Sequence, residues 1–207
     1  MKKIPFLLPA ALIALFIGQA FAQTTVSDLN DEIQAGRITV ENMRGNGSST
    51  GMAIYGRIRN TTSRTLRINT NLRQPMYLGN RTSGSRQNMV AFSVYGRGGS
   101  YFTDGRSSFI EVPANQSHDV QLLAYCADYE KENPTLADQF VISQVPPEIS
   151  EITRKIAEYK RRNPDDDSIQ AFQVALWLAQ GLSPEEIRRT FDFSQQDEIK
   201  ARRIMNQ

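Results

Sequence analysis

The sequence predicts an α+β protein in which an N-terminal antiparallel β-sandwich of immunoglobulin-like outline precedes a small all-helical unit. Two observations predict this fold class. Between residues 37 and 125, short alternating apolar runs are separated by Gly, Asn, Ser and Pro at intervals typical of strands and turns. After Cys126, apolar residues recur instead at the three- and four-residue steps of helices.

The first 22 residues are typical of a secretory signal peptide. Lys2 and Lys3 form the positive start, residues 5–17 are mostly apolar, and Ala20-Phe21-Ala22 supplies the small residues before the cleavage point. The apolar run is short for a spanning helix. We therefore expect cleavage after Ala22, a secreted or periplasmic mature chain, and no transmembrane segment in it.

The predicted β-sandwich domain covers residues 23–127 and holds about seven strands. These strands are expected at residues 37–40, 52–59, 66–68, 76–78, 88–95, 108–112 and 120–125. Residues 60–63 have the composition of a turn, and the glycine-rich residues 96–100 are expected to form an exposed loop.

The predicted helical domain covers residues 128–207. A first amphipathic helix follows Pro146-Pro147 and stops at Asn163-Pro164. The next, at residues 169–180, is apolar on nearly all sides, so it is expected to be buried. Ser183-Pro184-Glu185-Glu186 combines a cap, a first-turn proline and two acids, which predicts another helix start, and a last helix is expected at residues 195–205.

The composition excludes several kinds of site. The chain has 207 residues, of which 40% are apolar, and it contains one Cys and one His. A disulfide framework and a zinc site built from Cys and His are therefore excluded, and no metal or cofactor is expected. His118 lies between Ser117 and Asp119 in a predicted turn, and neighbours in sequence do not form a catalytic triad. We expect no enzyme, because no nucleophile, base and orienting group come together.

The charges are unevenly distributed along the chain. Residues 37–127 hold eleven Arg against four acids, whereas residues 128–207 hold fifteen acids against eleven bases. The arginines are dispersed rather than clustered in sequence, which favours an ordinary solvated surface over an anion-binding site. The mature chain sums to a formal charge of zero, so the charge implies no nucleic-acid partner.

Residues 178–199 look like the helix-turn-helix of bacterial transcription regulators. However, Asp197 and Glu198 occupy the part of the would-be recognition helix that should meet DNA, where they would repel phosphates. A signal peptide would also keep the chain away from DNA. We expect a tight helical corner that uses the same capping residues.

Two further stretches resemble the signature of bacterial surface thioester domains. Tyr125-Cys126-Ala127-Asp128 has the aromatic-Cys segment followed by an acid, and residues 172–177 have the Gln-x-Ala-aliphatic-Trp segment, with Phe172 where the family usually has Thr. The resemblance implies an internal thioester between the Cys126 sulfur and the Gln173 side-chain carbonyl. It also implies flanking roles for Tyr125, Asp128, Ala175 and Trp177.

Both central residues are unusual in their setting. An amide on an all-apolar helix, such as that of Gln173, costs about 1–3 kcal/mol if its hydrogen bonds are not made. An unpaired Cys in a secreted chain also invites a specific explanation. A thioester would account for both. The alternative is that Cys126 packs as a small apolar residue and Gln173 bonds a backbone group.

The sequence therefore predicts a secreted or periplasmic binding module of the cell surface or envelope. In the leading hypothesis, the Cys126–Gln173 thioester attaches it covalently to an amine-bearing protein or small molecule. In the alternative, the chain is a non-covalent structural or interaction domain with a buried free Cys.

Overall fold

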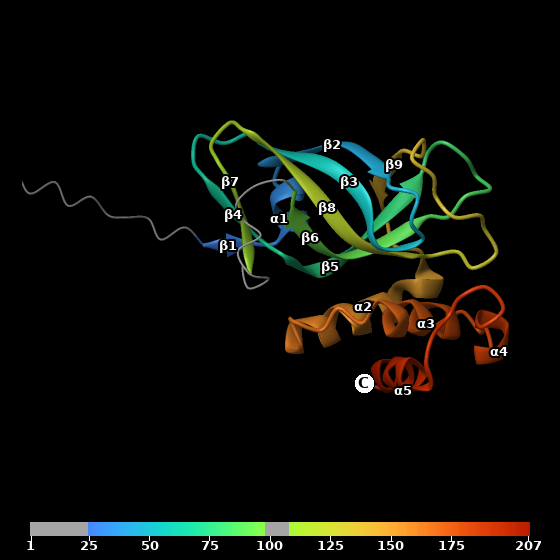
Figure 1. The fold of residues 1–207 in the computed structure, drawn as a ribbon. Helices are drawn as coiled ribbons and strands as arrows, with labels where there is room; N and C mark the ends of the chain where they lie inside the picture. Colours follow the sequence, from blue (N-terminus) through green and yellow to red (C-terminus); the bar gives the residue numbers. More distant parts are fainter. Residues whose placement is uncertain (1–24, 98–107) are drawn as a thin grey trace, which may run out of the picture.

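The structure is a computed structural model that describes residues 25–97 and 108–207. It is a mixed α+β fold in which a strand-rich N-terminal part is followed by helices (Figure 1), so the predicted class and order are confirmed. The predicted signal peptide and most of the predicted loop at residues 96–100 lie outside the described residues. Among the described residues, no helix is long and apolar enough to cross a membrane.

The seven predicted strands are all present, several of them longer than expected. The elements of the strand-rich part are β1 (Val26–Ser27), α1 (Leu29–Gln34), β2 (Ile38–Gly45), β3 (Thr50–Asn60), β4 (Leu66–Asn69), β5 (Asn71–Asn80), β6 (Met89–Gly96), β7 (Phe109–Val112), β8 (Ser117–Cys126) and β9 (Phe140–Ser143). The sequence did not predict β1, α1 and β9. Each is short and depends on partners that lie far away in sequence.

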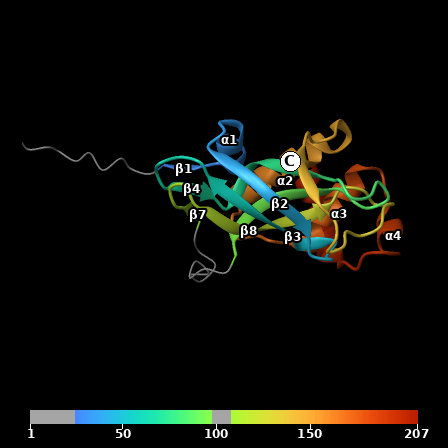
Figure 2. The same ribbon diagram turned by 90° about the horizontal axis from the view of Figure 1, so that it is seen from above.

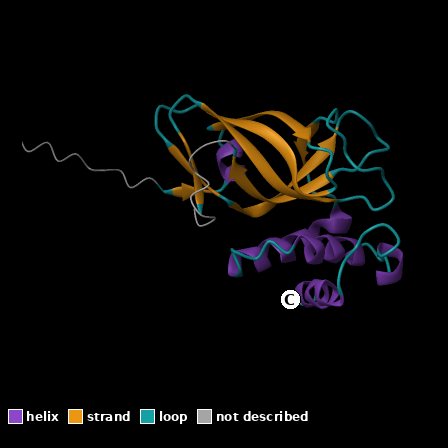
Figure 3. Cartoon of the chain, in the orientation of Figure 1, coloured by secondary structure: helices purple, strands orange, loops and turns teal. Residues whose placement is uncertain are grey.

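The strands form two sheets, but the immunoglobulin-like sandwich is not confirmed. A six-stranded antiparallel sheet has the order β2-β3-β8-β6-β5-β9, and β1, β4 and β7 form a three-stranded sheet. The larger sheet curls until its edges meet, where Arg44 forms a bridge with Gln139 and the Gly45 N–H donates to the Asp138 carbonyl. We call this six-stranded sheet the barrel (Figure 3). Bulges in β2, β3, β5 and β6 favour the curl, because a bulge bends and twists a strand.

The barrel extends beyond the predicted domain boundary at residue 127. Strand β9 pairs antiparallel with β5, with Tyr77 opposite Ser143 and Asn80 opposite Phe140. The sheet thus includes residues that the sequence analysis placed in the helical domain. A short strand at this position covers an edge of β5 that would otherwise be open.

Seen from above, β1, β4 and β7 lie at one end of the molecule and α4 at the other (Figure 2).

The helices lie in layers against one side of the barrel (Figure 1). They are α2 (Pro147–Arg162), α3 (Ile169–Ala179), α4 (Pro184–Ile187) and α5 (Gln195–Met205), close to the predicted bounds. We call them together the helical unit. Helices α2 and α3 contact the barrel, and α5 packs on the outer side of α3. This position explains why α3 is apolar on nearly all sides: it is covered by β8 on one side and α5 on the other.

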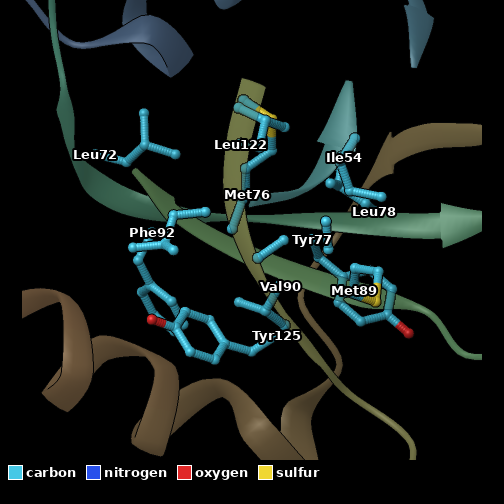
Figure 4. Packing of buried hydrophobic residues seen from close by; sticks show 14 of the residues in the cluster. Ile54, Leu72, Met76, Tyr77, Leu78, Met89, Val90, Phe92, Leu122 and Tyr125 are labelled. Carbon is cyan, nitrogen blue, oxygen red and sulfur yellow. The ribbon is translucent and has the colours of Figure 1, made fainter. Parts of the chain in front are cut away.

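Strands β6 and β8 are buried on both faces. Leu122 points into the barrel, whereas Phe92 and Tyr125 point toward the helices (Figure 4). Tyr125 packs edge-on against Phe92 at 5.6 Å and against Phe172 of α3 at 5.9 Å between ring centroids. This double burial accounts for the continuous apolar runs of these two strands. It also places the end of β8 directly against α3.

Candidate functional site

Cys126 and Gln173 meet in the core at the end of β8. The Cys126 N–H donates to Gln173 Oε1 at 2.8 Å, and Gln173 Nε2 donates to the Cys126 carbonyl at 2.9 Å. Both residues are fully buried. The Gln173 amide therefore pairs with the Cys126 backbone much as a neighbouring strand would, and it fixes α3 to β8. We call this pair of hydrogen bonds the Gln173 clamp.

The Cys126 thiol contacts groups other than the Gln173 amide. Its Sγ is 2.7 Å from the Ser49 carbonyl oxygen and 3.9 Å from Met89 Sδ. Burial, with a smaller contribution from the charge of Asp128, raises the pKa of the Cys126 thiol far above its usual range. Since the thiolate is the nucleophilic form, this environment holds the sulfur in its less reactive state. Gln173 makes the backbone bonds expected of the non-covalent alternative.

The predicted flanking residues lie around this pair in different ways. The Tyr125 ring is buried beside the clamp, and Asp128 accepts hydrogen bonds from the N–H and the Nδ2 of Asn88, each at 2.8 Å. Ala175 is buried within α3. Trp177 lies one helical turn beyond Gln173 and lines a surface cavity. The fold thus brings Cys126 and Gln173 together, whereas Asp128 bonds to Asn88 and Trp177 lines the cavity.

The cavity beside the clamp has a volume of about 360 Å³, and we call it the aromatic pocket. Ser49, whose carbonyl lies against the Cys126 sulfur, forms part of its wall. The other lining residues come from the loop before β6, the loop after β8, α3 and the segment after α4. They are Gln87, Tyr129, Glu130, Lys131, Glu132, Asn133, Trp177, Thr190 and Phe191.

Three aromatic rings give the pocket its apolar wall. The Trp177 ring stands edge-to-face with Tyr129 at 5.2 Å and with Phe191 at 5.3 Å. Tyr129 is held in place because its hydroxyl donates to the Glu186 carbonyl at 2.6 Å and accepts from Thr190 Oγ1 at 3.2 Å. Tyr129, which follows β8 in the chain, is thus held to α4 and the segment after it.

Two of the lining residues each carry a buried polar atom that lacks a hydrogen-bond partner among the described residues. These atoms are the indole N–H of Trp177, a residue 4% exposed, and Oε1 of Gln87, a residue 3% exposed. The Gln87 amide is oriented by its Nε2, which donates to the Lys131 carbonyl at 3.1 Å. An unmade buried hydrogen bond costs about 1–3 kcal/mol, so a ligand group that reached either atom would gain a hydrogen bond that the protein leaves unmade.

The rim of the pocket is mainly acidic. Glu130 makes no ion pair with any described residue, and Glu132 is 3.8 Å from Arg86. The ammonium of Lys131 lies 3.3 Å from Asp128, so that positive charge is already paired. The rim therefore favours a positively charged ligand group.

Two sequence-based expectations need correction or extension. His118 lies in strand β8 rather than in a turn, and burial lowers its pKa. Gln87, Tyr129 and Phe191 were not predicted as site residues, since nothing in the local sequence links positions so far apart. In the described part of the chain, no group of three or more His, Cys, Asp or Glu side chains is arranged to hold a metal ion.

No protein-family model, curated protein or solved structure matches this chain.

Proposed function

We propose that this chain is a non-enzymatic binding module, secreted or periplasmic, that holds amine-bearing partners non-covalently in the aromatic pocket. The observation that carries the proposal is an aromatic, acid-rimmed pocket in which two lining residues, Gln87 and Trp177, each have a buried polar atom without a partner among the described residues. In this proposal the Gln173 clamp is structural: it joins α3 to β8 and so places Trp177 opposite Tyr129.

The chemistry of the wall fits a lysine-like group. An ammonium against aromatic rings gains about 0.5–2 kcal/mol, more when water is excluded. Gln87 Oε1 and the Glu130 carboxylate are acceptors for its N–H groups, and the Trp177 N–H is a donor for a neighbouring carbonyl. A side chain with an ammonium and an adjacent peptide carbonyl would use all of these groups.

Binding can be followed through Trp177, the only tryptophan of the chain. Residues 23–207 would be titrated with Nα-acetyl-lysine amide, and with Nα-acetyl-norleucine amide as a neutral control of similar shape. We expect a saturable change in tryptophan fluorescence with the lysine compound only. Equal responses to both compounds, or no response to either, would overturn the proposal.

Variants of the pocket test its location. We expect Tyr129→Leu to weaken binding by about threefold to thirtyfold, because a ring face is lost. Glu130→Gln should also weaken it, since the charge of the rim falls. The matched control is Glu185→Gln, an exposed acid of α4 outside the pocket, which should bind as the unmodified chain does.

Intact mass separates this proposal from the covalent one. With a thioester, the mature chain would be lighter by one ammonia, and methylamine would then add its full mass. We expect the unmodified mass and no adduct. A deficit that disappears in Gln173→Ala would replace the non-covalent proposal with a Cys126–Gln173 thioester.

A further inference from the structure

Three arginines that are widely separated in sequence line one cleft on the outside of the barrel. The cleft has a volume of about 350 Å³ and is lined by Arg44, Arg57 and Arg97 together with Asp119. We call it the arginine cleft. It is separate from the aromatic pocket and shares no lining residue with it.

The register of four neighbouring strands brings these residues together. Arg44 of β2 lies opposite Tyr55 of β3, and Arg57 of β3 lies opposite Asp119 of β8. The chain leaving β6 then adds Arg97, whose N–H donates to the Asp119 carbonyl at 2.8 Å. Since Tyr55 and Arg57 are two residues apart on one strand, they share its outer face.

A bulge in β2 directs Arg44 toward this cleft. The register shifts between Glu41 and Arg44, and Asn42 takes the left-handed conformation with φ 54°. Beyond it Met43 is buried and Arg44 exposed. Residue 56 is glycine, and a Cβ there would lie 2.0 Å from Met43 Sδ, so a larger residue would displace the Met43 side chain. Bulges of this kind commonly redirect a side chain next to a functional site.

Within the described residues, the cleft holds more guanidinium groups than carboxylates to pair with them. Arg57 Nε donates to Asp119 Oδ1 at 2.7 Å, so one guanidinium and the one lining carboxylate balance each other. Arg97 lies over the Tyr55 ring at 4.2 Å, and its guanidinium makes no ion pair with any described residue. Arg44 likewise has no acidic partner in the described chain. Two guanidinium groups are thus available to an anion, while Glu41 lies near Arg57 without lining the cleft.

We propose that the arginine cleft binds a phosphomonoester. Guanidinium groups match phosphate oxygens with paired N–H donors, and two unpaired guanidiniums match the charge of a dianion. Leu136 also lines the cleft and is 71% exposed, which gives an apolar contact for the organic group of an ester. The cleft should therefore prefer an ester with an apolar group to inorganic phosphate.

Calorimetry on residues 23–207 tests the proposal, with phenyl phosphate as ligand and with inorganic phosphate and benzoate as comparisons at one ionic strength. We expect phenyl phosphate to bind most tightly. Arg44→Gln and Arg97→Gln should each weaken binding by at least about tenfold, since each removes charge-assisted hydrogen bonds. Arg44→Lys should recover only part of the affinity, because an ammonium cannot make the paired contact.

The matched control is Arg161→Gln, which removes an exposed arginine of α2 far from the cleft in the fold. It should bind phenyl phosphate as the unmodified chain does. Thermal melts would show that every variant is folded. If folded Arg44→Gln and Arg97→Gln bind as well as the Arg161→Gln control, or if the unmodified chain binds none of the anions, the proposal is wrong.

Vesicle binding distinguishes a lipid headgroup from a soluble molecule as the source of the phosphomonoester. Phosphatidylcholine vesicles with and without phosphatidic acid would be sedimented with the protein. Capture only with phosphatidic acid, lost in Arg44→Gln, would identify a lipid headgroup as the source. Binding of phenyl phosphate without capture by either vesicle would identify a soluble phosphomonoester.

Discussion

Gln173 shows how one polar side chain can organise a contact between apolar elements. Its amide uses both a donor and an acceptor on the backbone of one residue, Cys126, and both residues are fully buried. A buried amide of this kind is specific because few positions satisfy both of its ends. The clamp thus sets the position of α3 along β8, and with it the position of Trp177 in the aromatic pocket.

Removing the clamp should destabilise the fold. In Gln173→Ala, the N–H and the carbonyl of Cys126 are left buried without a partner, and we expect a loss of about 2–4 kcal/mol in the free energy of unfolding. Urea unfolding of the mature chain measures this. Gln180→Ala, which removes one hydrogen bond to the Leu176 carbonyl at the end of α3, should cost less than about 1 kcal/mol. Similar losses for both variants would contradict a special role for the clamp.

At the scale of the elements, Asp166 holds the helices together. Its carboxylate accepts from Tyr159 of α2, from Ser168 at the start of α3, and from Lys200 of α5 at 2.8 Å. Asp166 lies between α2 and α3 in the chain, yet its carboxylate contacts three helices.

This contact should make the helical unit sensitive to acid. Burial by itself raises the pKa of Asp166, but the hydrogen bonds from Lys200, Ser168 and Tyr159 outweigh it and lower the pKa to about 2, from an ordinary value of 3.8. A lowered pKa in the folded state means that the stabilisation is complete above about pH 4 and is lost as the pH falls through 2.

Unfolding midpoints between pH 5 and pH 2 would measure this effect. Asp166→Asn should lower stability by about 1–2 kcal/mol at pH 5 and by much less at pH 2, so the two curves converge in acid. Asp165→Asn, at an exposed neighbour without a hydrogen bond or ion pair to the described chain, should run parallel to the unmodified protein. Parallel curves for Asp166→Asn would exclude the proposed linkage.

At the scale of the whole molecule, the barrel and the helical unit share one core. Tyr125 of the barrel packs against Phe92 of β6 and against Phe172 of α3, and burying one such side chain contributes about 1.5–3 kcal/mol. The buried side of the helices is therefore completed by β6 and β8. The aromatic pocket depends on this packing of α3 against the barrel. The arginine cleft depends on the closed sheet, because its residues lie on neighbouring strands.

The helical unit should not fold by itself. Residues 144–207 expressed alone would expose the apolar side of α2 and α3 to water, and a segment of this size has little core of its own. We expect a broad, non-cooperative melt by circular dichroism, against one cooperative transition for residues 23–207. A sharp transition for the isolated segment would show that the helices form an independent domain.

The sequence by itself determined the longer strands and helices of this protein, and it drew attention to one pair of distant residues. The strands showed as alternating or continuous apolar runs, and Ser183 and Ser194 are the caps of two capping boxes at helix starts. The meeting of Cys126 and Gln173 followed from a buried amide that needed a partner and from the resemblance to thioester domains. These features depend on neighbours within a few residues, or on one unusual residue in an apolar setting.

Only the tertiary structure decided how the sheet closes and which distant side chains meet. Strand β9 exists because β5 lies beside it, and the barrel closes because bulges such as that at Glu41–Arg44 bend its strands. The arginines, dispersed in sequence, share a cleft because strand register places them on one face. Pairing and register are set by the packing of both faces of each strand, and a single segment contains no information about its partners.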